Sequence, residues 1–154
     1  LGVHRVLFLD HGYLAGDDTD HHIDTLARFC DERTIAYVKC EDKNDEHYDE
    51  LKAMEIDLKN FTTLDDKLYR LIPLPMADAI YEDGFRLPAT YANFLIINDT
   101  VLMPFYNSPK DEIARKQLQK AFPDREIVGI DCRVLIKQHG SLHCVTMQFP
   151  QGFL

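Results

Sequence analysis

The stretch NFLIINDTVLMPFYNSPKDEIARKQLQKAFPDREIVGI, residues 93–130, carries the pattern that decides the fold. Its first part holds two apolar segments, 93–97 and 101–105, which are separated by Asn98-Asp99-Thr100. Because Asn and Asp tolerate the backbone conformations of tight turns, these two segments are predicted to form a β-hairpin.

The second part of the stretch predicts a helix and a further strand. Ser108-Pro109-Lys110-Asp111 is a favourable helix start, because Ser caps, Pro suits the first helical position and Asp111 completes a capping box. The predicted helix carries Ile113, Leu118 and Phe122, and the apolar segment 126–130 follows it. The predicted order is therefore strand, strand, helix, strand.

The same order is found earlier in the chain. Segments 23–29 and 34–38 predict a hairpin, and 44–58 predicts an amphipathic helix with acids in its first turn. The segment 68–74 predicts the closing strand, which the prolines at 73 and 75 are expected to stop.

Two further segments extend this repetition. Val3–Leu9 is an apolar run that predicts a buried strand, and Cys144–Phe149 predicts the first strand of a third copy. An internal repeat of this size indicates a propeller-like or solenoid array. The expected fold class is α/β, built from repeated strand-strand-helix-strand units.

The repetition also predicts which residues meet. His22 and Asp24 are expected at the start of the first strand of one unit, Tyr91 and Asn93 at the start of the next, and Cys144 at the start of the third. Equivalent positions of a pseudo-symmetric array face one axis, so Cys144, His22 and Asp24 are expected to gather on one face. On a strand, His22 and Asp24 would also share one face.

The composition is that of one globular domain. The chain has 154 residues, of which 45% are hydrophobic, and its formal net charge is −9. An acidic balance argues against a nucleic-acid partner and is compatible with a cationic substrate, although solubility alone explains it. We expect no membrane span, because no apolar run is long enough, and no targeting signal.

The four cysteines, Cys30, Cys40, Cys132 and Cys144, include no CxxC pair and are too few for a disulfide framework. We therefore expect reduced thiols and a cytoplasmic location. Because the sequence does not begin with Met, we expect a fragment or a processed chain.

Two polar motifs supply candidate chemistry. Cys144 lies in GSLHCVTMQ, residues 140–148, and the segment GDDTDHHID, residues 16–24, joins histidines to carboxylates. A Cys with a His and carboxylates provides the components of thiol catalysis, and the acids suit a guanidinium substrate. From spacing alone, an inert buried Cys144 and a structural His22 remain the alternatives.

A metal site is the competing interpretation of the acidic and histidine-rich residues 10–22. Their spacing matches no zinc signature, and the EF-hand pattern lacks its terminal Glu. We therefore expect no metal.

The motifs together resemble those of the agmatine deiminases and the Porphyromonas-type peptidylarginine deiminases. The resemblance is carried by residues 16–24, by ARF at 27–29, by YANF at 91–94, by PDREIVGI at 123–130 and by GSLHCVT at 140–146. Where the family usually has Gly-His, this chain has His21-His22, and QHGSL at 138–142 replaces a glycine-rich stretch. We expect these departures to affect loop shape and substrate choice more than reaction type.

The resemblance covers only the C-terminal half of such enzymes. It implies that residues 1–154 are the C-terminal half of a deiminase catalytic domain with the five-bladed αβ propeller called the pentein fold. It also implies a partner, namely the missing N-terminal half, which carries a further acidic segment that contacts the substrate. Homo-oligomerisation is the alternative way to cover unpaired blades.

The resemblance further implies the roles of individual residues. Cys144 is the nucleophile, His22 the general acid and base, and Asp24 the carboxylate that holds the guanidinium. Asp18 is the additional acid expected to approach the substrate, and His143 is expected to be structural. No cofactor is implied.

The implied activity is hydrolysis of a guanidinium group through a covalent Cys144 intermediate. Agmatine would give N-carbamoylputrescine and ammonia, a step towards putrescine. Peptidyl-arginine or arginine, giving citrulline, is the alternative substrate class, and an amidinotransferase or a non-catalytic half-domain is the alternative function. We expect the isolated chain to be inactive, because a buried guanidinium needs more than one carboxylate.

Overall fold

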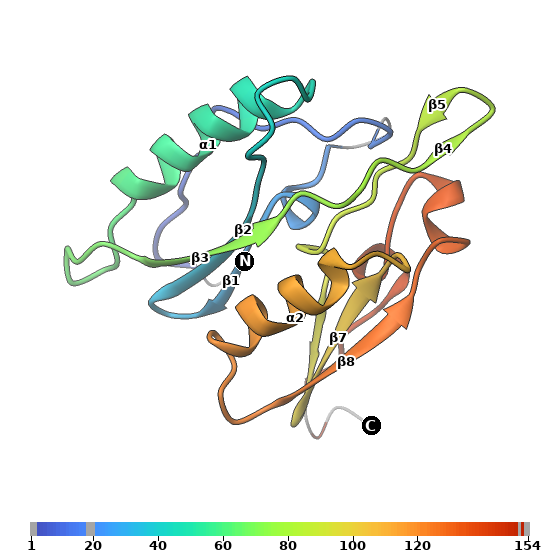
Figure 1. The fold of residues 1–154 in the computed structure, drawn as a ribbon. Coiled ribbons are helices and arrows are strands. Elements are labelled where there is room, and N and C mark those ends of the chain that lie inside the picture. The colour runs from blue at the N-terminus through green and yellow to red at the C-terminus, as the bar shows by residue number, and fades with distance from the viewer. Residues whose placement is uncertain (1–2, 18–20, 151, 153–154) are drawn as a thin grey trace.

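The structure, a computed structural model, describes residues 3–17, 21–150 and 152. It contains the strand-strand-helix-strand unit twice (Figure 1). The first unit comprises β1 (Ala27–Asp31), β2 (Thr34–Lys39), α1 (Tyr48–Asn60) and β3 (Arg70–Pro75). The second comprises β6 (Leu95–Ile97), β7 (Thr100–Phe105), α2 (Lys110–Gln119) and β8 (Glu126–Asp131). The mixed α/β class and the repetition predicted from the sequence are confirmed.

Each unit forms a three-stranded sheet with the same connectivity. β1 pairs antiparallel with β2, and β2 pairs parallel with β3. In the second unit β6 pairs antiparallel with β7, and β7 pairs parallel with β8. The second strand is thus central in each sheet, and the following helix makes the crossover that a parallel connection requires.

The core lies between these sheets and helices. β2 buries five consecutive residues, as expected of a central strand that is covered on both faces. α1 buries Leu51, Met54 and Leu58 along one stripe. α2 packs against β8 of its own sheet and against β3 of the other, so this helix joins the two units (Figure 1).

The turn and the capping bonds of the second unit form as predicted, although α2 begins at Lys110 and Pro109 is its N-cap rather than its first residue. Ile97 pairs with Thr100 across a two-residue turn, in which Asn98 has a left-handed φ of 48°. At the start of α2 the Lys110 N–H donates to Ser108 Oγ (3.0 Å), and the Ser108 N–H donates to Asp111 Oδ2 (3.1 Å). These reciprocal bonds stabilise the first turn of the helix.

Short elements connect and flank the two units. β4 (Tyr81–Glu82) and β5 (Phe85–Arg86) form a hairpin that projects from the body of the molecule (Figure 1). The 3-10 helices are η1 (Ile23–Thr25), η2 (Leu135–Gln138) and η3 (His143–Val145). In the part of the chain that the structure describes, no helix is long and apolar enough to cross a membrane.

The strand predicted at Val3–Leu9 is wrong. This segment has no regular structure, and the side chains of Val3 and Phe8 are 64% and 77% exposed. An apolar run becomes a strand only where a neighbour pairs with its backbone N–H and C=O groups. Among the described residues, no strand pairs with this segment.

Two segments predicted to start strands form 3-10 turns instead. In both turns a threonine bonds to the carbonyl group three residues earlier. The Thr25 N–H (3.2 Å) and its hydroxyl (2.9 Å) both donate to the carbonyl of His22, so β1 starts only at Ala27. The Thr146 N–H (3.0 Å) and its hydroxyl (2.8 Å) donate in the same way to His143. His22 and Asp24 are therefore not on a strand, and the predicted strand 144–149 does not form.

The closing strand of the first unit also runs further than predicted. β3 includes Pro73 and Pro75, which were expected to stop it. The N–H groups of Arg70 and Met76 donate to the side of β2, so by alternation positions 73 and 75 point away from it. Proline is tolerated there because β3 is at the edge of its sheet.

Candidate active site

Asn93 is the centre of a cluster that joins three distant segments of the chain, and it is fully buried. Its Nδ2 donates to the Oδ2 atom of Asp24 (2.9 Å) and to the Asp24 carbonyl (3.2 Å). Its Oδ1 accepts the backbone N–H groups of His143 (2.7 Å) and Cys144 (3.4 Å). One amide side chain therefore holds η1 against the loop that carries Cys144.

The two carboxylate oxygens of Asp24 have different environments. Oδ2 lies 2.9 Å from Asn93 Nδ2 and 2.6 Å from the ring nitrogen Nδ1 of His143. Oδ1 is buried and has no hydrogen-bond partner among the residues that the structure describes. Leaving a buried polar atom unsatisfied costs about 1–3 kcal/mol. Oδ1 is thus suited to a ligand that brings its own N–H groups.

Cys144 is the accessible thiol of the cluster. All four cysteines are free, and Cys144 is exposed, with Sγ 3.5 Å from Asn93 Oδ1. Burial raises the pKa of Cys30 to about 12 and the pKa of Cys132 to about 11. Those two thiols are therefore protonated at neutral pH, whereas Cys144 has the exposure that a nucleophile needs.

A glycine makes room beside the thiol. A Cβ atom at Gly140 would lie 3.1 Å from the Cβ of Cys144 and 3.5 Å from its Sγ. The same atom would lie 2.8 Å from the Nε2 of Gln138. Any side chain at position 140 would therefore displace its neighbours in the loop.

Arg28 places a cation near the cluster. Its Nη1 donates to the Phe94 carbonyl, and its guanidinium carbon lies 5.0 Å from the centroid of the Phe94 ring. Burial lowers the pKa of Arg28, while the negative charge of Asp24, and the Cys30 and Cys144 thiols only when they are ionised, oppose this shift. Asp24 and Cys144 therefore both lie within electrostatic range of a fixed positive charge.

Only some of the predicted site residues lie in the Asn93 cluster. It brings Asp24 and Cys144 into one hydrogen-bonded cluster, and it places the exposed His22 at the start of η1, where its carbonyl accepts bonds from Thr25. Asp18 lies outside the described residues. Asp17 is buried, and its Oδ2 lies 2.8 Å from the Thr25 hydroxyl oxygen, whose single proton it shares with the His22 carbonyl; this contact holds η1 in place.

Two residues of the cluster were not predicted as functional. Asn93 was noticed for its equivalent place in the repeat and as part of the YANF motif at 91–94, and these are the two signals that identify it. His143 was expected to be structural, yet its ring contacts Asp24 directly. Within residues 3–17, 21–150 and 152, no group of three or more His, Cys, Asp or Glu side chains is arranged to hold a metal.

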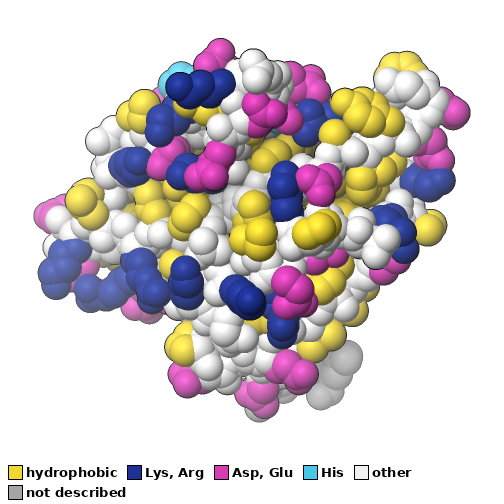
Figure 2. Space-filling model, viewed as in Figure 1, with side chains coloured by type: hydrophobic (Ala, Val, Ile, Leu, Met, Phe, Trp, Pro, Cys, Tyr) yellow, Lys and Arg dark blue, Asp and Glu magenta, His cyan; other side chains and the backbone are white. Residues whose placement is uncertain are grey.

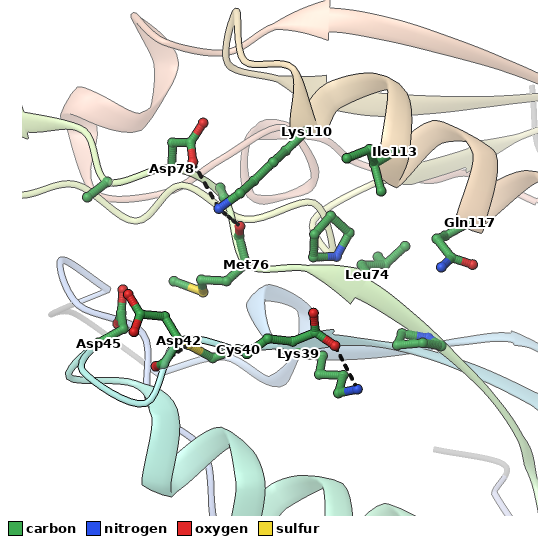
Figure 3. Close-up of a pocket in the computed structure, with 15 residues that line it drawn as sticks. Lys39, Cys40, Asp42, Asp45, Leu74, Met76, Asp78, Lys110, Ile113 and Gln117 are labelled. Carbon is green, nitrogen blue, oxygen red and sulfur yellow. Dashed lines mark hydrogen bonds and ion pairs between the residues drawn. The ribbon is translucent and has the colours of Figure 1, made fainter.

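A separate pocket of about 400 Å³ lies between the ends of β2 and β3 and the start of α2 (Figure 3). Its lysines already have partners. Lys110 Nζ lies 2.9 Å from Asp78 Oδ1 and 3.0 Å from the Met76 carbonyl, and Lys39 Nζ lies 3.0 Å from Glu41 Oε1. No residue of the Asn93 cluster lines this pocket, so it is not the candidate active site.

The fold and the cluster define an α/β protein of repeated units with an accessible thiol beside a carboxylate. The family described as Porphyromonas-type peptidyl-arginine deiminase matches residues 1–150 of this chain. The chain belongs to that family.

Individual relatives agree with this assignment. A Porphyromonas gingivalis structure with the provisional name arginine deiminase is 66% identical, with a TM-score of 0.97, and the match covers 100% of this chain and 45% of that one. The C. jejuni agmatine deiminase is 46% identical, with a TM-score of 0.83, over 93% of this chain and 41% of the other. A Marinomonas sp. protein provisionally named agmatine deiminase is 32% identical over 98% of this chain and 45% of its own length. The chain spans about half the length of the curated relatives it matches.

Proposed function

We propose that this protein hydrolyses a guanidinium group, with agmatine as the substrate and N-carbamoylputrescine and ammonia as the products. The observation that carries the proposal is the environment of Asp24. Its Oδ1 is buried without a donor among the described residues, and the same side chain is bonded through Asn93 to the backbone of Cys144. A guanidinium presents several N–H donors, and these can bond a carboxylate oxygen such as Oδ1.

The proposed reaction begins with attack of the Cys144 thiolate on the guanidinium carbon, which forms a C–S bond. His22 gives a proton to one amino nitrogen, and ammonia leaves as that C–N bond breaks. Water, deprotonated by His22, then attacks the same carbon. The C–S bond breaks as the new hydroxyl group becomes the carbonyl and gives its proton to solvent, which releases the ureido product and restores the thiolate. A histidine suits both steps because it can give and accept protons near neutrality.

The neighbouring side chains support this assignment of roles. Asn93 and His143 both hold Oδ2 of Asp24, which leaves Oδ1 for the substrate. Bound there, the guanidinium carbon would be held near Cys144, and such alignment is a large part of catalysis. We propose Asp18 as a second acid that approaches the substrate.

The names of the relatives set the order of candidate substrates. Agmatine comes first because the C. jejuni structure and the curated relatives carry the name agmatine deiminase. Arginine or peptidyl-arginine, giving citrulline, comes second because the family description and the P. gingivalis relative name those activities. With agmatine, the product lies on the route to putrescine. We propose the cytoplasm as the location, where the four free thiols stay reduced.

We extend the proposal to the architecture. The two units would be blades of a five-bladed propeller, and residues 1–154 would be the C-terminal half of its catalytic domain. Large apolar side chains are exposed, among them Phe8 (77%), Leu64 (74%) and Leu68 (68%), and Figure 2 shows apolar side chains between charged ones on the face with α1 and α2. The other half of the domain would cover such surface, and a second copy of the chain is the alternative.

The first experiment measures ammonia release by the intact protein from agmatine, arginine and an arginine peptide, with the products identified by mass spectrometry. We expect release from agmatine, none from Cys144→Ser, and retained agmatine binding without turnover in His22→Asn. Transfer of the amidino group to an added amine, without net ammonia release, would indicate an amidinotransferase. Full activity of Cys144→Ser would overturn the proposal.

The second experiment tests the architecture. Residues 1–154 produced alone should show no ordinary turnover of agmatine, because among the described residues Asp24 is the carboxylate assigned to the guanidinium, and a buried guanidinium needs more than one. Light scattering should show self-association. A monodisperse monomer that turns agmatine over at an ordinary enzyme rate would show that these residues need no partner.

A further inference from the structure

The hydroxyl group of Tyr106 uses its full hydrogen-bonding capacity in the interior of the protein. Tyr106 is 4% exposed. Its hydroxyl donates to the Thr90 carbonyl (2.9 Å), accepts the Thr90 N–H (3.0 Å) and lies 3.2 Å from the hydroxyl of Ser141. A phenol has one donor and two acceptor positions, so all three are occupied.

These partners belong to the segments that build the candidate active site. Thr90 precedes Asn93 by three residues, and Ser141 precedes Cys144 by three residues. The hydroxyl of Thr90 also donates to the Thr25 carbonyl (2.7 Å), next to Asp24. A single phenol therefore connects the segment of Asn93 to the loop of Cys144, and through Thr90 to η1.

We propose that Tyr106 is a positioning residue for the active site: its hydroxyl fixes the loop of Cys144 relative to Asn93 and Asp24. The inference rests on the proposed function, because it assigns Tyr106 a role in aligning the thiol with the carboxylate that binds the guanidinium. Tyr106 itself does not touch the reacting atoms.

A neighbouring tyrosine provides a matched control. Tyr91 is also buried, and its ring lies 5.5 Å from that of Tyr106. Its hydroxyl donates to Asp111 Oδ1 (2.7 Å), and the same carboxylate accepts the backbone N–H groups of Tyr106 (3.0 Å) and Ser108 (3.1 Å), which precede α2. Burial raises the pKa of both phenols, so both stay neutral. Removing either hydroxyl deletes buried hydrogen bonds, but only Tyr106 is bonded to the loop of Cys144.

The experiment compares two alkylating reagents on the intact wild-type protein, Tyr106→Phe and Tyr91→Phe. In both reactions the Cys144 thiolate displaces a halide and forms a C–S bond. Chloroacetamidine has an amidinium that Asp24 can bind, whereas iodoacetamide has none. The ratio of the two rate constants at Cys144, followed by mass spectrometry, therefore reports how well Asp24 and the thiol are aligned.

Both variants should lower Tm by a similar amount, roughly a few °C, because each loses buried hydrogen bonds. Only Tyr106→Phe should lower the rate ratio, by about tenfold, and lower kcat similarly with little change in KM. If Tyr106→Phe does not fold, Ser141→Ala, which removes one bond to the same hydroxyl, should lower the ratio by about threefold.

The outcomes separate the two proposals. A wild type with no preference for chloroacetamidine would overturn the proposed role of Asp24 and this inference with it. A wild-type preference that persists in Tyr106→Phe, or falls equally in Tyr91→Phe, would overturn the positioning role and leave the proposed function standing.

Discussion

Replacing Asn93 by Ala tests the contact on which the candidate active site depends. The side chain makes a charge-assisted bond to Asp24 at 2.9 Å and accepts the His143 N–H at 2.7 Å. A charge-assisted bond contributes about 1.5–3 kcal/mol and a neutral one about 0.5–1.5 kcal/mol. Because the buried partners are then left unsatisfied, we expect a loss of about 3–5 kcal/mol in the free energy of unfolding.

The assay is urea unfolding of Asn93→Ala beside Asn44→Ala, together with agmatine binding to each. Asn44 is exposed, and the hydrogen bond at this residue comes from its backbone N–H, so its variant should change stability by no more than about 0.5 kcal/mol. Asn93→Ala should also lose agmatine binding, since Asp24 and the Cys144 loop separate. Equal stability of the two variants, or unchanged agmatine binding in Asn93→Ala, would refute the reasoning.

Three further predictions follow from the same contacts. At neutral pH iodoacetamide should label Cys144 alone, because a pKa of about 11 leaves roughly 10⁻⁴ of Cys132 as thiolate; equal labelling before and after denaturation would contradict this. Burial raises the pKa of Asp45, but bonds from Arg86 and from the His47 ring and backbone N–H outweigh it and hold that pKa well below its usual range. The contribution of ionised Asp45 to the free energy of unfolding should therefore be complete above about pH 4 and be lost as the pH falls further. In Asp45→Asn, Tm should consequently depend less on pH in this range. Gly140→Ala should lower kcat by about tenfold with little change in Tm, because the new Cβ displaces Cys144; an unchanged kcat would show that the loop can adapt.

The repeated units could be predicted because their signals are local. The turn at Asn98 and the cap at Ser108 each depend on a few adjacent residues, and the structure uses them as expected. The strand predictions that were wrong failed because an apolar sequence pattern does not show whether a neighbouring strand or a competing turn is present. Val3–Leu9 has an apolar pattern but no neighbouring strand in the described chain, and Thr25 and Thr146 each close a turn through a hydroxyl bond.

The candidate active site could be predicted only in part. Cys144 and Asp24 belong to conspicuous motifs, and the repeat predicted their proximity, although both lie in 3-10 helices and not on the strands that the repeat assigned to them. Asn93 is less visible in the sequence, because a single Asn at the start of an apolar segment is also typical of a turn. Its role depends on three-dimensional contacts with Asp24 and His143, which are 69 and 50 residues away in the chain.

The most direct test of the central claim is to trap the covalent intermediate. The intact protein is mixed with agmatine labelled at the guanidinium carbon, quenched with acid within one turnover, and digested for mass spectrometry. We predict label on the peptide that contains Cys144, in an adduct that has lost one ammonia and kept the aminobutyl chain, and no label in Cys144→Ser. Ammonia release without label on the protein, or equal labelling of Cys144→Ser, would contradict the assignment of Cys144 as the nucleophile.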